Sequence, residues 1–193
     1  MVEQTVVLVK PDGVKRGLVG RITTRFEESG LKIKAMKMVW VDKDLIAQHY
    51  SDREDFLRGM GEKTLKTYAE YGQDPHEELG TNDPLEIGKM VRAWNIEFLT
   101  SGPVVALLLA GIHAVSTVRK IVGSTLPVFA EPGTIRGGYS VDSPALANQK
   151  KRAVRNLVHA SGNVEEAEFE RKLWFHTDEV YDYERADHAI MFE

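Results

Sequence analysis

The chain has 193 residues, 42% of them hydrophobic, with a formal net charge of -4 and no cysteine. This length and apolar content predict one packed domain over residues 1–193, while the acidic balance and missing cysteines exclude a surface for tight non-specific nucleic-acid binding, a disulfide framework and a thiolate site. The N-terminus does not resemble a secretory signal and no apolar run is long enough to span a bilayer, so we expect a cytoplasmic protein without membrane or stable nucleic-acid partners.

The first fifty residues alternate between strand and helix patterns. Thr5–Val9 is a β-branched run typical of a buried strand, and it ends at the turn signal Lys10-Pro11-Asp12-Gly13. Apolar residues at helical spacing then predict a helix, which Gly30 ends: Leu18, Val19, Ile22 and Phe26. We expect a second strand over Leu31–Trp40 and a short helix over Asp44–Tyr50.

Residues 58–93 have a different, polar and glycine-containing composition, and we interpret them as a helical insertion. One helix is predicted over about Lys63–Tyr71, and a second begins after Asp83, which can cap it, with Pro84 in its first turn. The second helix carries an apolar face: Ile87, Met90, Val91, Trp94 and Phe98. That face needs a partner, and we favour the first helix or the neighbouring hairpin over another subunit.

The second half of the chain supplies the remaining elements. Val104–Leu109 is a continuous apolar run typical of a central strand, and residues 114–122 have a helical pattern. Ser124–Gly138 is interpreted as a loop, a helix begins at Asn163, and Lys172–Phe175 is predicted to be the last strand. The element order predicts an α+β fold of the ferredoxin-like (split βαβ) kind, a four-stranded antiparallel sheet with helices on one face and a helical insertion.

One of the six histidines stands out. Five lie in polar or helical contexts, where we expect solvated surface residues: His49, His76, His113, His176 and His188. His159 ends the apolar run Leu157-Val158 and precedes the small residues Ala160-Ser161-Gly162, so a strand would hold it with free space on one side. The pattern fits an exposed nucleophile, but it also fits a partly buried histidine whose hydrogen bonds are satisfied internally.

Three cations could converge on an anionic ligand. Lys10 ends the first strand, Arg119 lies near the end of a helix, and Arg136 lies in a glycine-rich loop. Each alone is also compatible with a solvated surface charge. A polyphosphate bound by an acidic protein needs several cations from different segments. The sequence contains neither a P-loop nor the motifs of protein kinases, which excludes those two phosphotransferase classes.

Several motifs together resemble the nucleoside diphosphate kinase family. They follow one another in the family's order: Lys10-Pro11-Asp12-Gly13-Val14, Ser101-Gly102-Pro103-Val104-Val105-Ala106, Pro132-Gly133-Thr134-Ile135-Arg136-Gly137, Asn156-Leu157-Val158-His159-Ala160-Ser161 and Leu173-Trp174-Phe175. The resemblance implies a ferredoxin-like fold and a phosphotransferase. Such an enzyme moves the γ-phosphoryl group of ATP or another nucleoside triphosphate to a nucleoside diphosphate, through a ping-pong mechanism with a phosphohistidine.

The resemblance also implies roles for individual residues. His159 corresponds to the nucleophile, and Ser161 and Glu170 to the groups that orient it. The phosphate ligands correspond to Lys10, Arg119 and Arg136, with Thr125 and Tyr50 beside them, and the sugar contact to Asn156. Mg²⁺ is implied as a bridge between nucleotide phosphates, with no metal site on the protein. The family implies a homo-oligomer, a hexamer or a tetramer.

The chain departs from the family pattern in three places. The insertion over residues 58–93 displaces the segment that carries the base-stacking aromatic, for which Phe56 is the nearest candidate. A second insertion, Ser140–Arg152, is expected to rim the nucleotide cleft. The acidic residue that usually follows the histidine motif is missing, since Gly162 follows Ser161.

Two other functions stay open at this stage. A nucleotide-binding module without turnover would share the fold, and a histidine phosphocarrier would use His159 on protein substrates. For the enzyme, activity should fall on the acid side near an imidazole pKa of about 6.5, shifted by its neighbours in a direction that the sequence does not give.

Overall fold

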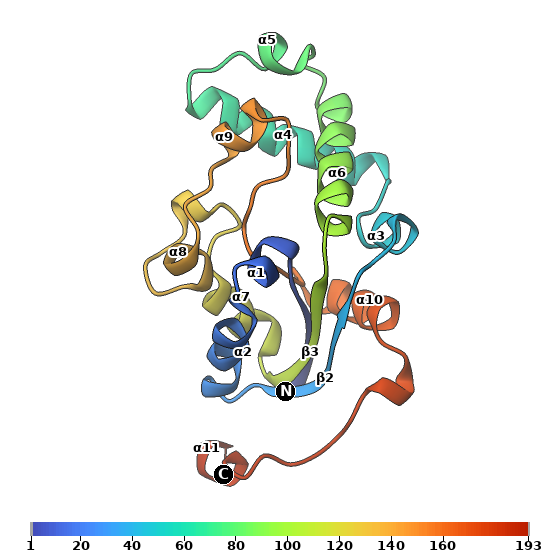
Figure 1. Cartoon of the computed structure of the whole chain (residues 1–193), viewed down its shortest axis with the longest axis vertical. Helices are drawn as coiled ribbons and strands as arrows, with labels where there is room; N and C mark the ends of the chain where they lie inside the picture. The colour runs from blue at the N-terminus through green and yellow to red at the C-terminus, as the bar shows by residue number, and fades with distance from the viewer. Residues whose placement is uncertain (1, 193) are drawn as a thin grey trace.

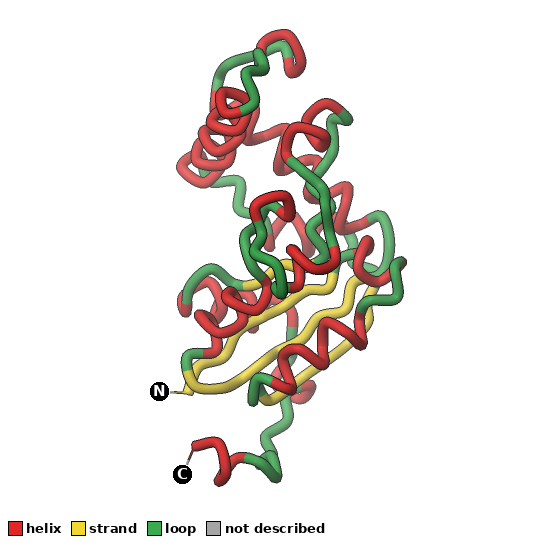
Figure 2. Tube along the Cα trace, turned by 90° about the vertical axis from the view of Figure 1, so that its left-hand side faces the viewer, coloured by secondary structure: helices red, strands yellow, loops and turns green. Residues whose placement is uncertain are grey.

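A four-stranded antiparallel sheet forms the centre of the molecule (Figures 1 and 2). The computed structural model describes residues 2–192. The strands β1 (Val2–Val9), β2 (Lys32–Val39), β3 (Val104–Ile112) and β4 (Val158–Ala160) stand in the order β2-β3-β1-β4. This order and the antiparallel pairing are those of the predicted ferredoxin-like plan, so the fold class is confirmed.

Alternating side chains of the central strands pack on both faces of the sheet. Val7, Leu107 and their neighbours meet α2 (Val19–Glu28) and α7 (Ala114–Val122). Val6, Leu108 and their neighbours meet α3 (Lys43–His49) and α10 (Val164–Trp174). The expectation that helices cover only one face was therefore wrong. Because Val6–Val9 of β1 and all of β3 are apolar, neither face of this part of the sheet could be left in water.

The fourth strand lies elsewhere than the sequence suggested. Lys172–Phe175 was predicted to be a strand, but its first three residues are the last turn of α10, and the edge strand is β4 with His159 in it. The Asn163 side chain accepts from the Glu166 backbone N–H and starts the helix, which continues until Trp174 is buried against the sheet. A short apolar run does not distinguish a strand from a helix end.

The loops contain further short helices. Residues 124–138 were predicted as a loop, yet they hold η1 (Pro127–Phe129) and the start of α8 (Ile135–Tyr139). The remaining short helices are α1 (Pro11–Lys15), α9 (Pro144–Gln149), η2 (Thr177–Glu179) and α11 (His188–Phe192). No helix in the described part of the chain is long and apolar enough to cross a membrane.

The segment predicted to be an insertion, residues 58–93, lies within a helical hairpin that stands above one end of the sheet (Figure 1). The hairpin consists of α4 (Glu54–Glu70), α5 (Pro75–Leu79) and α6 (Pro84–Thr100). As predicted, α6 packs against the first helix of this segment. The first helix begins earlier than the predicted Lys63, because the polar residues Glu54 and Asp55 form its first turn rather than a loop.

Two glycines allow α4 and α6 to cross with backbones in contact. A Cβ atom on Gly61 would overlap the carbonyl group of Pro84, and one on Gly88 would overlap the carbonyl group of Leu57. A backbone cannot move as a flexible side chain can, so any larger residue would push the helices apart.

We predict that Gly88→Ala destabilises the protein by about 1–3 kcal/mol, because the new methyl group meets the backbone of α4. Gly59→Ala is the matched control. Gly59 also lies inside α4, but nothing stands near its missing side chain, so the substitution should stabilise by about 0.5–1 kcal/mol. Urea unfolding of both variants measures the difference. Equal effects would show that the helices do not cross at Gly88.

Candidate active site

Hydrogen bonds hold each residue of the segment that leads into β4. The Arg136 guanidinium donates to the carbonyl oxygens of Asn156 at 3.1 Å and Val158 at 2.7 Å. Leu157 has the unusual φ of +69°, and its N–H donates to the Asp12 carboxylate at 3.1 Å. His159 follows in β4, paired with Leu8 of β1. A strained backbone held by so many bonds places the imidazole with little freedom.

A buried carboxylate orients the His159 ring. The Nε2 atom of His159 lies 2.6 Å from Oε1 of Glu170, whose side chain is 2% exposed. The other oxygen of Glu170 accepts from the Ser161 hydroxyl at 2.7 Å, and that hydroxyl accepts from the Val6 N–H at 3.1 Å. When Nε2 carries the proton and donates to Glu170, the lone pair is on Nδ1. The free nucleophilic nitrogen is therefore Nδ1.

His49 lies against this pair, contrary to the expectation that it is a surface residue. Its ring stands edge-on to the His159 ring, with centroids 4.5 Å apart, and its Nδ1 accepts from the Trp174 indole N–H at 3.3 Å. Burial, and next the proximity of His159, lower the pKa of His49 to about 3, so the ring is neutral. No pattern around His49 predicted this, because its contacts with His159 and Trp174 join segments that are distant in the sequence.

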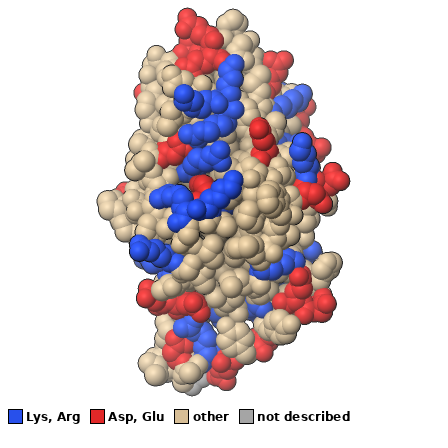
Figure 3. Space-filling model, in the orientation of Figure 1, with Lys and Arg blue, Asp and Glu red and all other residues tan. Residues whose placement is uncertain are grey.

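A cavity of about 200 Å³ opens beside His159. Its lining brings together most of the residues that the sequence singled out: Lys10, Tyr50, Arg119, Thr125, Arg136, Asn156 and His159. The Lys10 ammonium group donates to Asn156 Oδ1 at 2.8 Å, and the Asn156 amide donates to the Thr125 carbonyl at 2.9 Å. Basic side chains also gather in a band on the face shown in Figure 3, although the protein is acidic overall.

Burying the cations of the cavity without a bound anion costs free energy. Lys10 and Arg136 are almost fully buried. Burial and the nearby Arg136 lower the pKa of Lys10 to about 8, and burial and the nearby Arg119 lower the pKa of Arg136 to about 10. A bound polyphosphate would offset this repulsion, so the site is complementary to an anion.

The same environment keeps the His159 imidazole neutral. Burial and then the Lys10 charge lower the pKa of His159 to about 3. This is the direction of the shift that the sequence left open: the pKa of His159 lies below 6.5. Burial, and next the Glu170 charge, raise the pKa of Tyr50, so its phenol stays protonated and is available as a hydrogen-bond donor in the cavity.

Two residues that line or border the site escaped the sequence analysis. Asn95 of α6 lines the cavity, although its position on a mostly apolar helix face gave no signal. The Glu166 carboxylate accepts from the Gly162 N–H at 2.8 Å and occupies the space where a side chain at position 162 would begin. The Glu166 carboxylate thus lies near position 162, where the family pattern usually has an acidic residue and this chain has glycine.

Phe56 lies apart from this cavity. Its ring is 41% exposed and lines a neighbouring groove with Tyr50, His159 and Phe169. No carboxylate lines the cation-rich cavity among the described residues. The donor atoms of His49, His159 and Glu170 come within 4.8 Å of one another, a spacing that could hold a metal, but their hydrogen bonds already engage them.

Comparison with known proteins agrees with this arrangement of residues. The family model for nucleoside diphosphate kinase matches residues 3–58 and 87–180. The chain belongs to the nucleoside diphosphate kinase family. Members transfer phosphoryl groups between nucleotides, and this chain is an enzyme of that kind. Residues 59–86, within the predicted insertion, lie outside the match.

Individual relatives match this chain over nearly its whole length. The nucleoside diphosphate kinase of Pyrobaculum aerophilum is 50% identical over 179 residues, which are 93% of this chain and 98% of the relative. The crystal structure of an NDP kinase from that organism superposes with a TM-score of 0.91 at 48% identity, covering 94% of this chain and all of the other. The Borrelia burgdorferi enzyme, solved as a transition-state mimic with vanadate and ADP, has a TM-score of 0.78 at 33% identity, covering 98% and 96%.

We predict that histidine phosphorylation at subsaturating Mg-ATP keeps its rate from about pH 8 down to about pH 5, because His159 is already neutral there. Above about pH 8 the rate should fall as Lys10 loses its charge in the free enzyme. At saturating nucleotide, this fall in rate should occur at a higher pH, because bound phosphates favour the charged form of Lys10. A decline centred near pH 6.5 would contradict a neutralised His159.

Proposed function

We propose that the kinase works by a ping-pong mechanism through phospho-His159. The supporting observation is that Glu170 occupies Nε2 while Nδ1 is left for attack beside the cationic cavity. In the first half-reaction, the Nδ1 lone pair forms a bond to the γ-phosphorus and the bond to the β-phosphate oxygen breaks. The leaving diphosphate takes that electron pair. In the second half-reaction, a terminal oxygen of another nucleoside diphosphate attacks the phosphorus and releases Nδ1.

The cations stabilise the charge that spreads over the transferring group. Lys10, Arg119 and Arg136 come from three different elements and converge on one cavity, so a polyphosphate can contact all three. Tyr50 and Thr125 add hydrogen-bonding groups, and Asn156, held by Lys10, is placed for a sugar hydroxyl. Because carboxylates are absent from the described lining, the divalent cation enters as part of the substrate, and we propose Mg²⁺ bridging nucleotide phosphates.

The nucleoside part needs a second compartment. A groove of about 520 Å³ adjoins the phosphate cavity and shares Asn95, Thr125 and Asn156 with it. Trp94 and Phe129 line this groove and offer aromatic surface. We propose that sugar and base lie here, with Trp94 as the stacking residue. The candidate suggested by the sequence, Phe56, would instead require the base to lie in the groove on the other side of Tyr50.

A homo-oligomer is the expected assembly, and we propose a hexamer or tetramer. β2 is an edge strand of the sheet. Met36, Met38 and Trp40 are more than half exposed on or just after it. A row of large apolar side chains on an open edge favours contact with another copy.

We predict that His159→Ala abolishes acid-labile phosphate on the protein after incubation with ATP, because the nucleophile is lost. Glu170→Gln should still form it, about 10–100-fold more slowly, since the amide orients the ring less well. His76→Ala is the control, because His76 is exposed on α5 and should keep full activity. The measurement is phosphoprotein formation from labelled ATP and its release by GDP. Phosphoprotein in the alanine variant would exclude His159 as carrier.

The stacking residue is decided by two matched substitutions. Trp94→Leu should raise KM for nucleotides by about fivefold to 100-fold, as the loss of one stacking contact of about 1–3 kcal/mol predicts. Phe56→Leu should leave KM nearly unchanged. Steady-state kinetics with GDP as acceptor measure both, with phosphohistidine formation as a check on the remaining site. The reverse pattern would restore Phe56 as the stacking residue.

A further inference from the structure

The nucleoside groove has walls that the family motifs do not supply. One wall is α4, with Met60, Thr64 and Thr67, in the part of the insertion that the family model does not match. The facing wall is α9 and the residues just after it, with Asn148 and Arg152. The helices α4 and α9 also contact each other. The two insertions therefore enclose the end of the groove that lies away from the phosphates.

Among the described residues, Asn148 is the buried polar side chain on these walls that has no hydrogen-bond partner. Its exposed fraction is 7%, yet among the described residues its side-chain amide makes no hydrogen bond. Thr67, equally buried on the facing wall, donates to the Lys63 carbonyl at 3.1 Å. Among the described residues, the side-chain atoms that lack a partner and are closed off from solvent belong to residues other than Asn148. The Asn148 amide therefore remains open to the groove that it lines. An amide that is nearly buried, has no partner in the protein and opens onto the groove is available to bind a ligand there.

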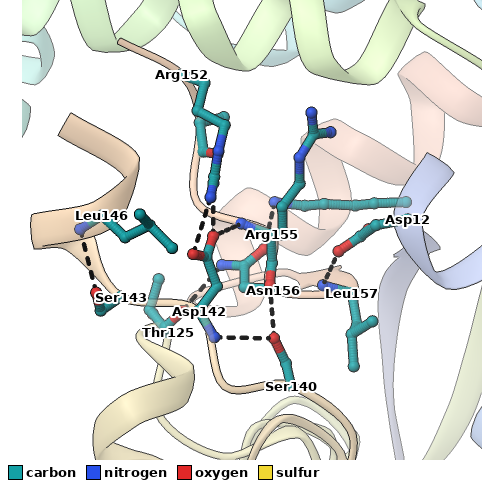
Figure 4. A network of polar contacts seen from close by, with 12 residues as sticks. Asp12, Thr125, Ser140, Asp142, Ser143, Leu146, Arg152, Arg155, Asn156 and Leu157 are labelled. Carbon is teal, nitrogen blue, oxygen red and sulfur yellow. Dashed lines mark hydrogen bonds and ion pairs between the residues drawn. The ribbon is translucent and has the colours of Figure 1, made fainter. Parts of the chain in front are cut away.

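The position of Asn148 relative to the sugar site is fixed by a polar clasp (Figure 4). The buried Asp142 carboxylate accepts from the Arg152 guanidinium at 2.6 and 3.0 Å and from the Arg155 N–H at 2.6 Å. The Ser140 hydroxyl donates to the Arg155 carbonyl at 2.7 Å. These bonds link the residues on both sides of α9 to Arg155, which directly precedes Asn156. The helix is therefore held in place relative to Asn156, the proposed sugar contact.

We propose that the Asn148 amide hydrogen-bonds the edge of the nucleotide base. This inference rests on the proposed place of the nucleoside in the groove. Adenine and cytosine present an amino group beside a ring acceptor, whereas guanine and uracil present a carbonyl beside a ring N–H. An amide carries one donor and one acceptor, and turning it by 180° exchanges them. Asn148 thus binds either class of base, as a kinase acting on several nucleotides requires.

Asn148→Asp removes the donor and keeps the shape, so it distinguishes base reading from packing. The carboxylate has acceptors only, so it can accept from both the ring N–H and the 2-amino group of guanine. Beside the one N–H that it accepts from any other base, it meets the ring acceptor of adenine or cytosine or the carbonyl of uracil, which it repels. With phosphorylated enzyme as donor, kcat/KM for GDP relative to ADP, CDP and UDP should rise about tenfold, the effect of one hydrogen bond of about 1.4 kcal/mol. Asn82→Asp, exposed in the same insertion, is the control for added charge and should change no ratio. An equal loss for all four bases, or no change, would overturn the proposal.

A second variant keeps the test independent of the added charge. Wild-type enzyme should prefer ADP about tenfold over its analogue without the 6-amino group, and Asn148→Leu should abolish that preference. Persistence of the preference in the leucine variant would overturn the role of Asn148. Phosphohistidine formation from ATP is measured in parallel. Its presence in all variants separates a failure of base reading from a failure of the ping-pong mechanism.

Discussion

The hydrogen bond between His159 and the buried Glu170 carboxylate is the interaction on which the rest of the site depends. It joins the edge strand β4 to the helix α10 that covers it, and it decides which ring nitrogen is free. Burial raises the pKa of Glu170, so the carboxylate needs its bonds to Ser161 and His159 to remain ionised. The second layer of helices therefore does more than cover the sheet, because it supplies and buries the group that orients the nucleophile.

A second constraint is the cost of buried positive charge. Lys10 and Arg136 have lowered pKa values in the free protein, which shows that the site is electrostatically unfavourable until an anion arrives. Arg136 offsets part of this cost by bonding the backbone around Asn156 and Val158. One guanidinium therefore both shapes the segment before His159 and lines the cation-rich cavity, which couples the fold of that segment to the charge of the cavity.

Much of this was predictable from sequence. The motif around His159 and the cations Lys10, Arg119 and Arg136 identified the cavity residues, and the strands β1 to β3 followed from their apolar runs. What escaped depends on contacts between distant segments. His49 is surrounded by Tyr50, His159 and Trp174, and the Glu166 carboxylate reaches the Gly162 N–H from the following helix. The lowered pKa of His159 arises from burial and the Lys10 charge, neither of which is visible in the neighbouring residues.

The close crossing of α4 and α6 has a consequence for how such a chain is assembled over evolution. Gly88 touches the backbone at Leu57, so the chain leaves the common kinase body and re-enters it at the same place. The family match stops at residue 58 and resumes at residue 87, on either side of that contact. A segment whose ends meet can be gained, lost or lengthened as one unit without changing the register of any strand. The tip at α5 is accordingly the place where the chain tolerates new termini or an inserted domain.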